Sequence, residues 1–151
     1  MTPAHVLRKC REFFCFEVRQ LQLEGSTMEN YLFVFLGGGI GASARYWLSG
    51  AVYRFLPTDF PYGNLAVNIL GSFLIGVLMA SFEERFALNP SLRVFLAIGI
   101  LGGFTTFSSF SYETMALLRD AEMLRATINV AISVLGCLLA TYFGLLLGKI
   151  L

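Results

Sequence analysis

Four apolar runs constrain this chain more than any other feature of its sequence. They occupy residues 31–52, 63–82, 92–118 and 126–147. A membrane-spanning helix needs about 20 mostly apolar residues, and each run is long enough. The loops between the runs are short and rich in proline or charge, so no soluble domain fits between them. The sequence therefore predicts an all-α integral membrane protein with four transmembrane helices.

Composition agrees with a membrane protein and argues against several other classes. The chain is 56% hydrophobic and 14% charged, whereas a typical soluble domain is roughly 45–50% apolar and about 25% charged. Its net charge of +1 offers no basic surface for nucleic acid. One histidine and three cysteines without paired spacing provide neither a metal set nor a nucleophile–base pair. We therefore expect a protein that is not an enzyme.

The first 27 residues differ from the rest of the chain. They mix basic and aromatic residues, and their charges interrupt any signal-peptide core. They can be an amphipathic surface helix, a disordered tail, or residues upstream of a true start at Met28. We favour the last two, because "MENYLFVFLGGGIGA" reads as a complete beginning. The predicted domains are thus an N-terminal extension, 1–27, and a membrane domain, 28–151.

Positive charge in the loops is balanced across the predicted membrane. From Met28 onward, one side would hold Arg85, Arg93 and Lys149, and the other Arg54, Arg119 and Arg125. Orientation follows the Lys/Arg bias of short loops, and here that bias is zero. The balance predicts a chain that inserts either way up, whereas the basic residues of 1–27 would favour an N-terminus inside.

Several polar residues interrupt the apolar runs. Buried ionisable residues usually face a bundle interior or a watery path. The set comprises Arg45, Asn64, Asn68, Glu113, Asn129 and Ser133. Arg45 can snorkel to the interface, Asn64 can cap the second helix, and Glu113 can be the partner of Arg45. Asn68 is one turn too deep to be a cap, so it either bonds a neighbouring helix or faces a pore, and we favour the pore.

Small residues recur at helical spacing in the first two runs. Gly37 lies four residues before Gly41, and Ser72 lies four before Gly76. Small residues at this spacing allow helices in a membrane to approach closely. We interpret both pairs as packing contacts.

The third run is too long for one straight crossing. Its 27 residues would form a helix of about 40 Å, against a hydrocarbon core of roughly 30 Å. Tilt can absorb the excess. A break at "GGFTT", residues 102–106, is the other solution, because threonine hydroxyls can satisfy the freed backbone groups. The ends of broken helices can bind ions through free carbonyls or amides.

Three phenylalanines follow the glycines at intervals of three. Phe104, Phe107 and Phe110 would form a stripe on one helix face. Such a stripe usually faces lipid or fills a core. Because an aromatic ring has a positive edge, the same rings could also stabilise a small anion in a narrow path, and their spacing permits both interpretations.

Three segments in this order, "GGGIGASARYW", "FPYGNLAVNILGSFLIG" and "GILGGFTTFSSFSYE", resemble the Fluc (CrcB-type) fluoride channel family. The resemblance covers residues 28–151. It implies four-helix subunits that form antiparallel, dual-topology homodimers and export fluoride passively across the bacterial inner membrane, which gives fluoride resistance. It also implies a third helix broken at the membrane centre.

The resemblance assigns roles to particular residues. Backbone carbonyls of Gly102 and Thr105 from both subunits would hold a structural sodium ion at the dimer centre. The implied fluoride pore comprises Phe107, Phe110, Asn68, Ser108, Ser109, Asn129 and Ser133. Arg45 and Glu113 match the charged residues of the family's first and third helices, and Phe104 is left as packing. Asn64 and Asn129 depart from the family's frequent Thr and Tyr, but remain polar.

The main alternative is a small multidrug-type cation exporter, which also has four spans and dual topology. Such a proton-coupled exporter is expected to carry a buried carboxylate in its first span. Here that span contains Arg45 and no acidic residue after Glu29, which disfavours cation export. A structural membrane protein that uses its polar residues only for packing is a second alternative.

Overall fold

The computed structural model describes residues 28–84 and 90–150, and within these ranges the regular structure is entirely helical. The predicted extension, 1–27, lies outside the described residues. In chain order the elements are α2 (Met28–Val52), α3 (Tyr62–Glu84), α4 (Pro90–Arg93), the π-helix η1 (Val94–Leu101), α5 (Gly102–Phe104), α6 (Phe107–Arg119) and α7 (Met123–Ile150). Each predicted apolar run therefore coincides with one helix or with one series of helical segments.

Three stretches of the described chain are long and apolar enough to cross a membrane. They are Tyr62–Phe82, Pro90–Arg119 and Met123–Ile150. Helix α2 has 25 residues but is not one of the three. The observed architecture is that of a helical membrane protein with several spans.

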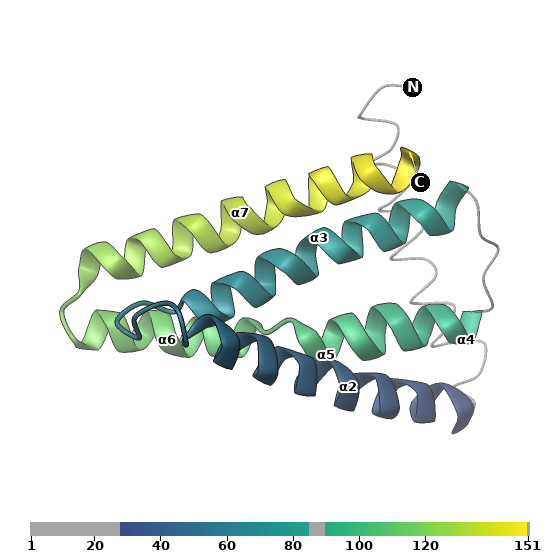
Figure 1. Cartoon of the computed structure of the whole chain (residues 1–151), viewed down its shortest axis with the longest axis horizontal. Helices are drawn as coiled ribbons and strands as arrows, with labels where there is room; N and C mark the ends of the chain where they lie inside the picture. The colour runs from purple at the N-terminus through teal and green to yellow at the C-terminus, as the bar shows by residue number, and fades with distance from the viewer. Residues whose placement is uncertain (1–27, 85–89, 151) are drawn as a thin grey trace.

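The helices pack as two long pairs (Figure 1). α3 lies along α7, and α2 lies along η1 and α5. α6 continues beyond the break and packs beside the first part of α7. Only 11% of the most apolar part of α7 is buried inside the chain. The outward surface of this helix is therefore left to lipid or to another copy.

Glycines permit the close approach of the paired helices. A Cβ atom at Gly37 would lie 2.7 Å from the carbonyl oxygen of Phe95 and 2.9 Å from the Cα of Gly99. Such contacts are shorter than real Cβ contacts, so there is no room for a side chain at Gly37. At the α3–α7 crossing, Gly76 would meet the backbone carbonyl of Thr141 in the same way. The packing interpretation is confirmed for Gly37 and Gly76.

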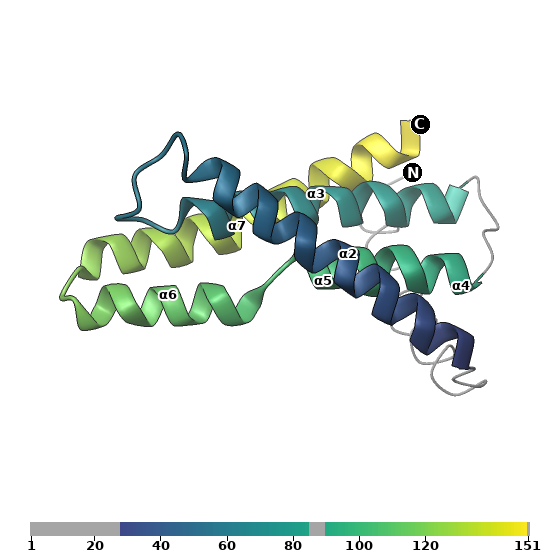
Figure 2. The same cartoon turned by 60° about the horizontal axis from the view of Figure 1, so that its bottom comes forward.

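The predicted break in the third run is present (Figure 2). α5 ends at Phe104, and Thr105 (φ −80°, ψ 155°) and Thr106 (φ −149°, ψ 118°) are extended before α6 begins at Phe107. Both glycines of "GGFTT" remain helical, so the break falls on the threonines. It lies halfway along the 30-residue segment Pro90–Arg119. The preceding η1 is a π-helix, a form often found at functional sites.

Candidate functional site

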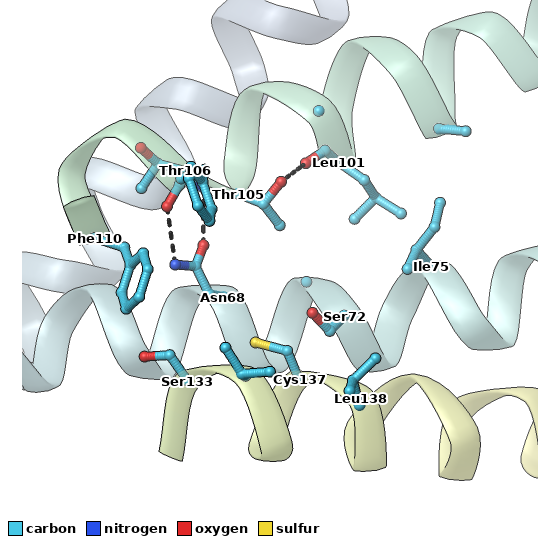
Figure 3. A pocket seen from close by; sticks show the side chains of 15 residues that line it. Asn68, Ser72, Ile75, Leu101, Thr105, Thr106, Phe110, Ser133, Cys137 and Leu138 are labelled. Carbon is cyan, nitrogen blue, oxygen red and sulfur yellow. Dashed lines mark hydrogen bonds between the residues drawn. The ribbon is translucent and has the colours of Figure 1, made fainter. Parts of the chain in front are cut away.

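The backbone groups of the break have partners from two directions. The N–H and the hydroxyl of Thr105 both donate to the Leu101 carbonyl, each at 3.0 Å. The N–H of Thr106 donates to Oδ1 of Asn68 at 2.8 Å, and Nδ2 of Asn68 donates to the Thr106 carbonyl at 3.0 Å. Figure 3 shows Asn68 reaching from α3 to the break with its amide between these two groups. Unpaired backbone groups are costly at membrane depth, and Asn68 satisfies two of them.

The side chain of Thr106 organises the start of α6. As the N-cap residue it accepts a hydrogen bond from the Ser109 N–H at 3.3 Å. Its Oγ1 also lies 3.0 Å from Oγ of Ser109 and 3.3 Å from Oγ of Ser108. The hydroxyls of Ser108 and Ser109 therefore turn toward the cap, and neither residue lines the cavity beside the break.

That cavity has a volume of about 520 Å³ and lies between the break, α3 and α7. Of the residues predicted from the sequence, its walls include Asn68, Phe107, Phe110, Ser133, Gly102 and Thr105. Figure 3 shows the side chains of Asn68, Phe110 and Ser133 around one end of it. Several of the residues predicted for the anion path and both of those predicted for the cation, Gly102 and Thr105, therefore line one cavity.

The phenylalanine stripe divides into two environments. The ring centroids of Phe107 and Phe110 are 5.4 Å apart, and both rings border the cavity. Phe107 is 78% exposed in the single chain. Phe104 is only 7% exposed and lies against Gly71, where an added Cβ would be 3.2 Å from its ring. The interpretation of Phe104 as packing is confirmed.

A chain of hydrogen bonds extends from the cavity wall between α6 and α7. Ser133 donates to Oδ1 of Asn129 at 3.4 Å, and Nδ2 of Asn129 donates to Oγ1 of Thr114 at 2.9 Å. Thr114 in turn donates to the Phe110 carbonyl at 2.8 Å. Asn129 is 2% exposed and does not line the cavity. It links the wall residue Ser133 to the helix that carries Phe110.

The two charged residues within the predicted spans, Arg45 and Glu113, are not paired with each other in the described chain. The carboxylate of Glu113 lies near the side chain of Asn64 and interacts with it, and its Oε2 is buried without a hydrogen-bond partner among the described residues. No ion pair joins Glu113 to Arg45 in the part of the chain that the structure describes. Asn64 is the third residue of α3 rather than its cap. The capping interpretation of Asn64 and the pairing of Arg45 with Glu113 are therefore wrong.

Several site residues were missed by reasoning from the sequence. Thr114 and Cys137 were not singled out, Ser72 was assigned to packing, and Thr106 was named only as part of the predicted break and not as a partner of Asn68. Ser72 and Cys137 line the cavity, and Figure 3 shows them on facing helices. Helical spacing was an available signal, because Ser72 follows Asn68 by four residues and Cys137 follows Ser133 by four. Thr106 had no comparable signal, since its partner Asn68 is 38 residues away.

The break also offers oxygen atoms that suit a cation. In a continuous helix the Gly102 carbonyl would accept from the Thr106 N–H, but that N–H is bonded to Asn68. Gly102 is exposed on the cavity wall, and Thr105 carries its carbonyl on extended backbone. Among the described residues there is no group of three His, Cys, Asp or Glu side chains that could hold a metal. The carbonyls of Gly102 and Thr105 fit a hard cation such as sodium, which prefers oxygen ligands.

These features define a class of protein. In this small helical membrane protein, a broken span, two phenylalanine rings and amide and hydroxyl donors surround one cavity. This arrangement is typical of proteins that conduct ions.

Comparison with known proteins gives the family. The family model described as "CrcB-like protein, Camphor Resistance (CrcB)" matches residues 32–145. The chain is 47% identical over 124 residues to the "Fluoride-specific ion channel FluC" of Citrifermentans bemidjiense, covering 82% of this chain and 100% of that relative. It is 50% identical over 125 residues to the protein of the same name from Geotalea uraniireducens, with the same coverage of 82% and 100%. The chain belongs to the CrcB-like family.

Proposed function

We propose that this protein is a fluoride-specific ion channel, and not an enzyme or a multidrug-type cation exporter. The observation that carries the proposal is its 47–50% identity along the full length of relatives named for that activity. As a passive channel in the bacterial inner membrane, it would let fluoride leave the cell down its gradient. Export lowers the cytoplasmic fluoride concentration and so gives fluoride resistance.

The cavity supplies groups that can replace the water around a small anion. Asn68 has two amide N–H donors, of which one is bonded to Thr106, so the other is left for the cavity. The hydroxyl of Ser133 lies on the same wall, and the rings of Phe107 and Phe110 can present positive edges. Several weak donors together stabilise a dehydrated fluoride without binding it too tightly to leave.

The other predicted pore residues support this wall. Asn129 orients Ser133, while Ser108 and Ser109 fix the start of α6 and thereby the rings that follow. Glu113, which lies near Asn64, and Arg45 are charged residues of a vestibule at the ends of the path. In this proposal these residues shape the route, whereas Asn68, Ser133, Phe107 and Phe110 contact the ion.

The working unit is an antiparallel homodimer in which each copy crosses the membrane four times. With α2 as the fourth span, a single chain is still too small to enclose a path. One face of α6 is strongly exposed in the single chain, with Phe107, Tyr112 and Met115 between 55% and 78% exposed. A second copy inserted the other way up would cover this face, and the balanced loop charge allows such insertion.

A sodium ion at the dimer centre fits the carbonyl groups of the break. One chain offers the carbonyls of Gly102 and Thr105, and a two-fold axis beside them would double this number. Bound there, the ion supplies positive charge that holds two breaks together. If assembly and fluoride flux do not depend on sodium, the assignment to Gly102 and Thr105 is incorrect.

Fluoride efflux from liposomes tests the function directly. The purified protein is reconstituted, the vesicles are loaded with potassium fluoride, and valinomycin allows potassium to follow. We expect fluoride release on an electrode and no chloride release in a matched potassium chloride preparation. Absence of fluoride flux from a folded dimer would refute the proposal, and proton-coupled export of an organic cation would support the alternative.

A further inference from the structure

The contact between Asn68 and Thr106 matches both main-chain groups of one residue. Oδ1 accepts from the Thr106 N–H at 2.8 Å, and Nδ2 donates to the Thr106 carbonyl at 3.0 Å. An extended residue in a sheet receives this pair of bonds from a neighbouring strand. Thr106 is extended, but no strand is near it in the described chain. The side chain of Asn68 takes the place of that strand.

These two bonds compete with continuation of the helix. Helical geometry would pair the Thr106 N–H with the Gly102 carbonyl. Thr106 is only 6% exposed, so its backbone groups cannot turn to water for a partner. A buried group that loses its hydrogen bond is costly, and without Asn68 the nearest remedy is a bond to Gly102. That bond would draw the Gly102 carbonyl back into the helix.

We propose that Asn68 is a positioning residue that holds the helix break open and, by taking the Thr106 N–H, leaves the Gly102 carbonyl free to bind the cation beside the carbonyl of Thr105. The cation site and the anion cavity then depend on one side chain. Asn68 forms part of the wall of the anion cavity, and its bond to Thr106 creates the cation site. The clamp on Thr106 stands independently of transport, whereas its effect on sodium rests on the proposed function.

The clamp is tested with Asn68→Leu, which keeps the branched shape of the side chain and removes both hydrogen bonds. Full-length protein with ¹³C-labelled threonine is reconstituted in lipid without fluoride, and the backbone shifts of Thr106 are measured by solid-state NMR. We expect extended shifts in the wild type and a move toward helical values in the variant. Asn68→Ser, too short to reach both groups, serves if the leucine variant does not fold.

Ser133→Ala is the matched control, because Ser133 lines the same cavity but makes no bond to the break. It should leave the Thr106 shifts extended. Extended shifts in Asn68→Leu, or an equal change in Ser133→Ala, would overturn the clamp. The NMR samples contain no fluoride, so their result does not depend on transport. A wild-type protein that fails to conduct fluoride would refute the proposed function and leave the NMR result unchanged.

Sodium titration tests the second half of the proposal. The dimer fraction is followed by size exclusion as sodium replaces N-methylglucamine at constant ionic strength. Of the two bonds that Asn68→Leu removes, only the one to the Thr106 N–H bears on the Gly102 carbonyl. We therefore expect the sodium midpoint to rise about tenfold, the size of effect that loss of one buried hydrogen bond produces. The midpoint of Ser133→Ala should not move. Altered Thr106 shifts with an unmoved sodium midpoint would overturn the link to the cation site.

Discussion

Substitution of Asn129 by leucine gives the most direct measure of the hydrogen bonds between α6 and α7. The change keeps the branching and the number of non-hydrogen atoms of the side chain but removes the donor to Thr114 and the acceptor for Ser133. Thr114 keeps a partner, because its hydroxyl donates to the Phe110 carbonyl. Ser133, 8% exposed, loses its described partner.

The expected loss of stability depends on Ser133, because Ser133 loses its partner whereas Thr114 keeps one. Hydrogen bonds between membrane helices contribute about 0.6 kcal/mol on average and at most about 1.7 kcal/mol. A buried group left unsatisfied costs about 1–3 kcal/mol. With one such group left by Asn129→Leu, we expect the free energy of unfolding to fall by about 1–2 kcal/mol. Fluoride flux should also fall, since Ser133 on the cavity wall is no longer oriented.

A double-mutant cycle with Thr114→Val isolates the interhelical bond. Both single variants and the double variant are unfolded reversibly by SDS titration in mixed micelles, with far-UV circular dichroism as the signal. The coupling energy between the two positions should be about 0.6–1.7 kcal/mol. A coupling energy near zero would show that Asn129 and Thr114 do not stabilise each other, and the reasoning from this bond would fail.

Other substitutions test separate parts of the structure. Phe110→Ile should reduce fluoride flux in liposomes while size exclusion still shows a dimer; wild-type flux would remove this ring from the path. Gly76→Val places a side chain against the α7 backbone and should destabilise the fold in SDS by about 1–3 kcal/mol, whereas Gly39→Ala, which meets open space, should unfold like the wild type. Arg125→Ala removes a half-exposed ion pair of 3.1 Å with Asp59 and should change stability by no more than about 1 kcal/mol; a larger loss would mean that this pair fastens the loop. A reporter fused to the C-terminus of a chain starting at Met28 should be detected on both sides of the membrane, and a single orientation would contradict dual insertion.

The parts of the fold that depend on local sequence were predicted well. The positions of the helices follow from runs of apolar residues, and the break follows from a run too long to cross once. The packing role of Phe104 came from the family resemblance and not from the spacing of the three rings, which left both interpretations open. The helices and the break arise from distances of a few residues along one chain, where helical geometry alone relates sequence to space.

The polar contacts were predicted less well because they join different helices. Asn64 was expected to cap α3 and Glu113 to pair with Arg45, yet in the structure the side chains of Asn64 and Glu113 lie near each other. The pore role of Ser108 and Ser109 stays a prediction, and in the single chain their hydroxyls lie within hydrogen-bonding distance of Thr106. For Asn64 and Glu113 the packing of α3 against α6 decides which partner is reached, whereas Ser108 and Ser109 meet Thr106 within one turn of the same segment.

The sequence by itself determined that this protein is helical and membrane-embedded, that its third long segment is broken, and that polar residues are placed where lipid would not tolerate them. Those properties follow from the transfer of side chains and backbone out of water, which composition and spacing already specify. Only the tertiary structure decided that Asn68 holds Thr106 and leaves the Gly102 carbonyl without its helical partner. That outcome depends on α3 passing within hydrogen-bonding distance of the break, and Gly71 permits this approach because a side chain there would collide with Thr105 and Phe104.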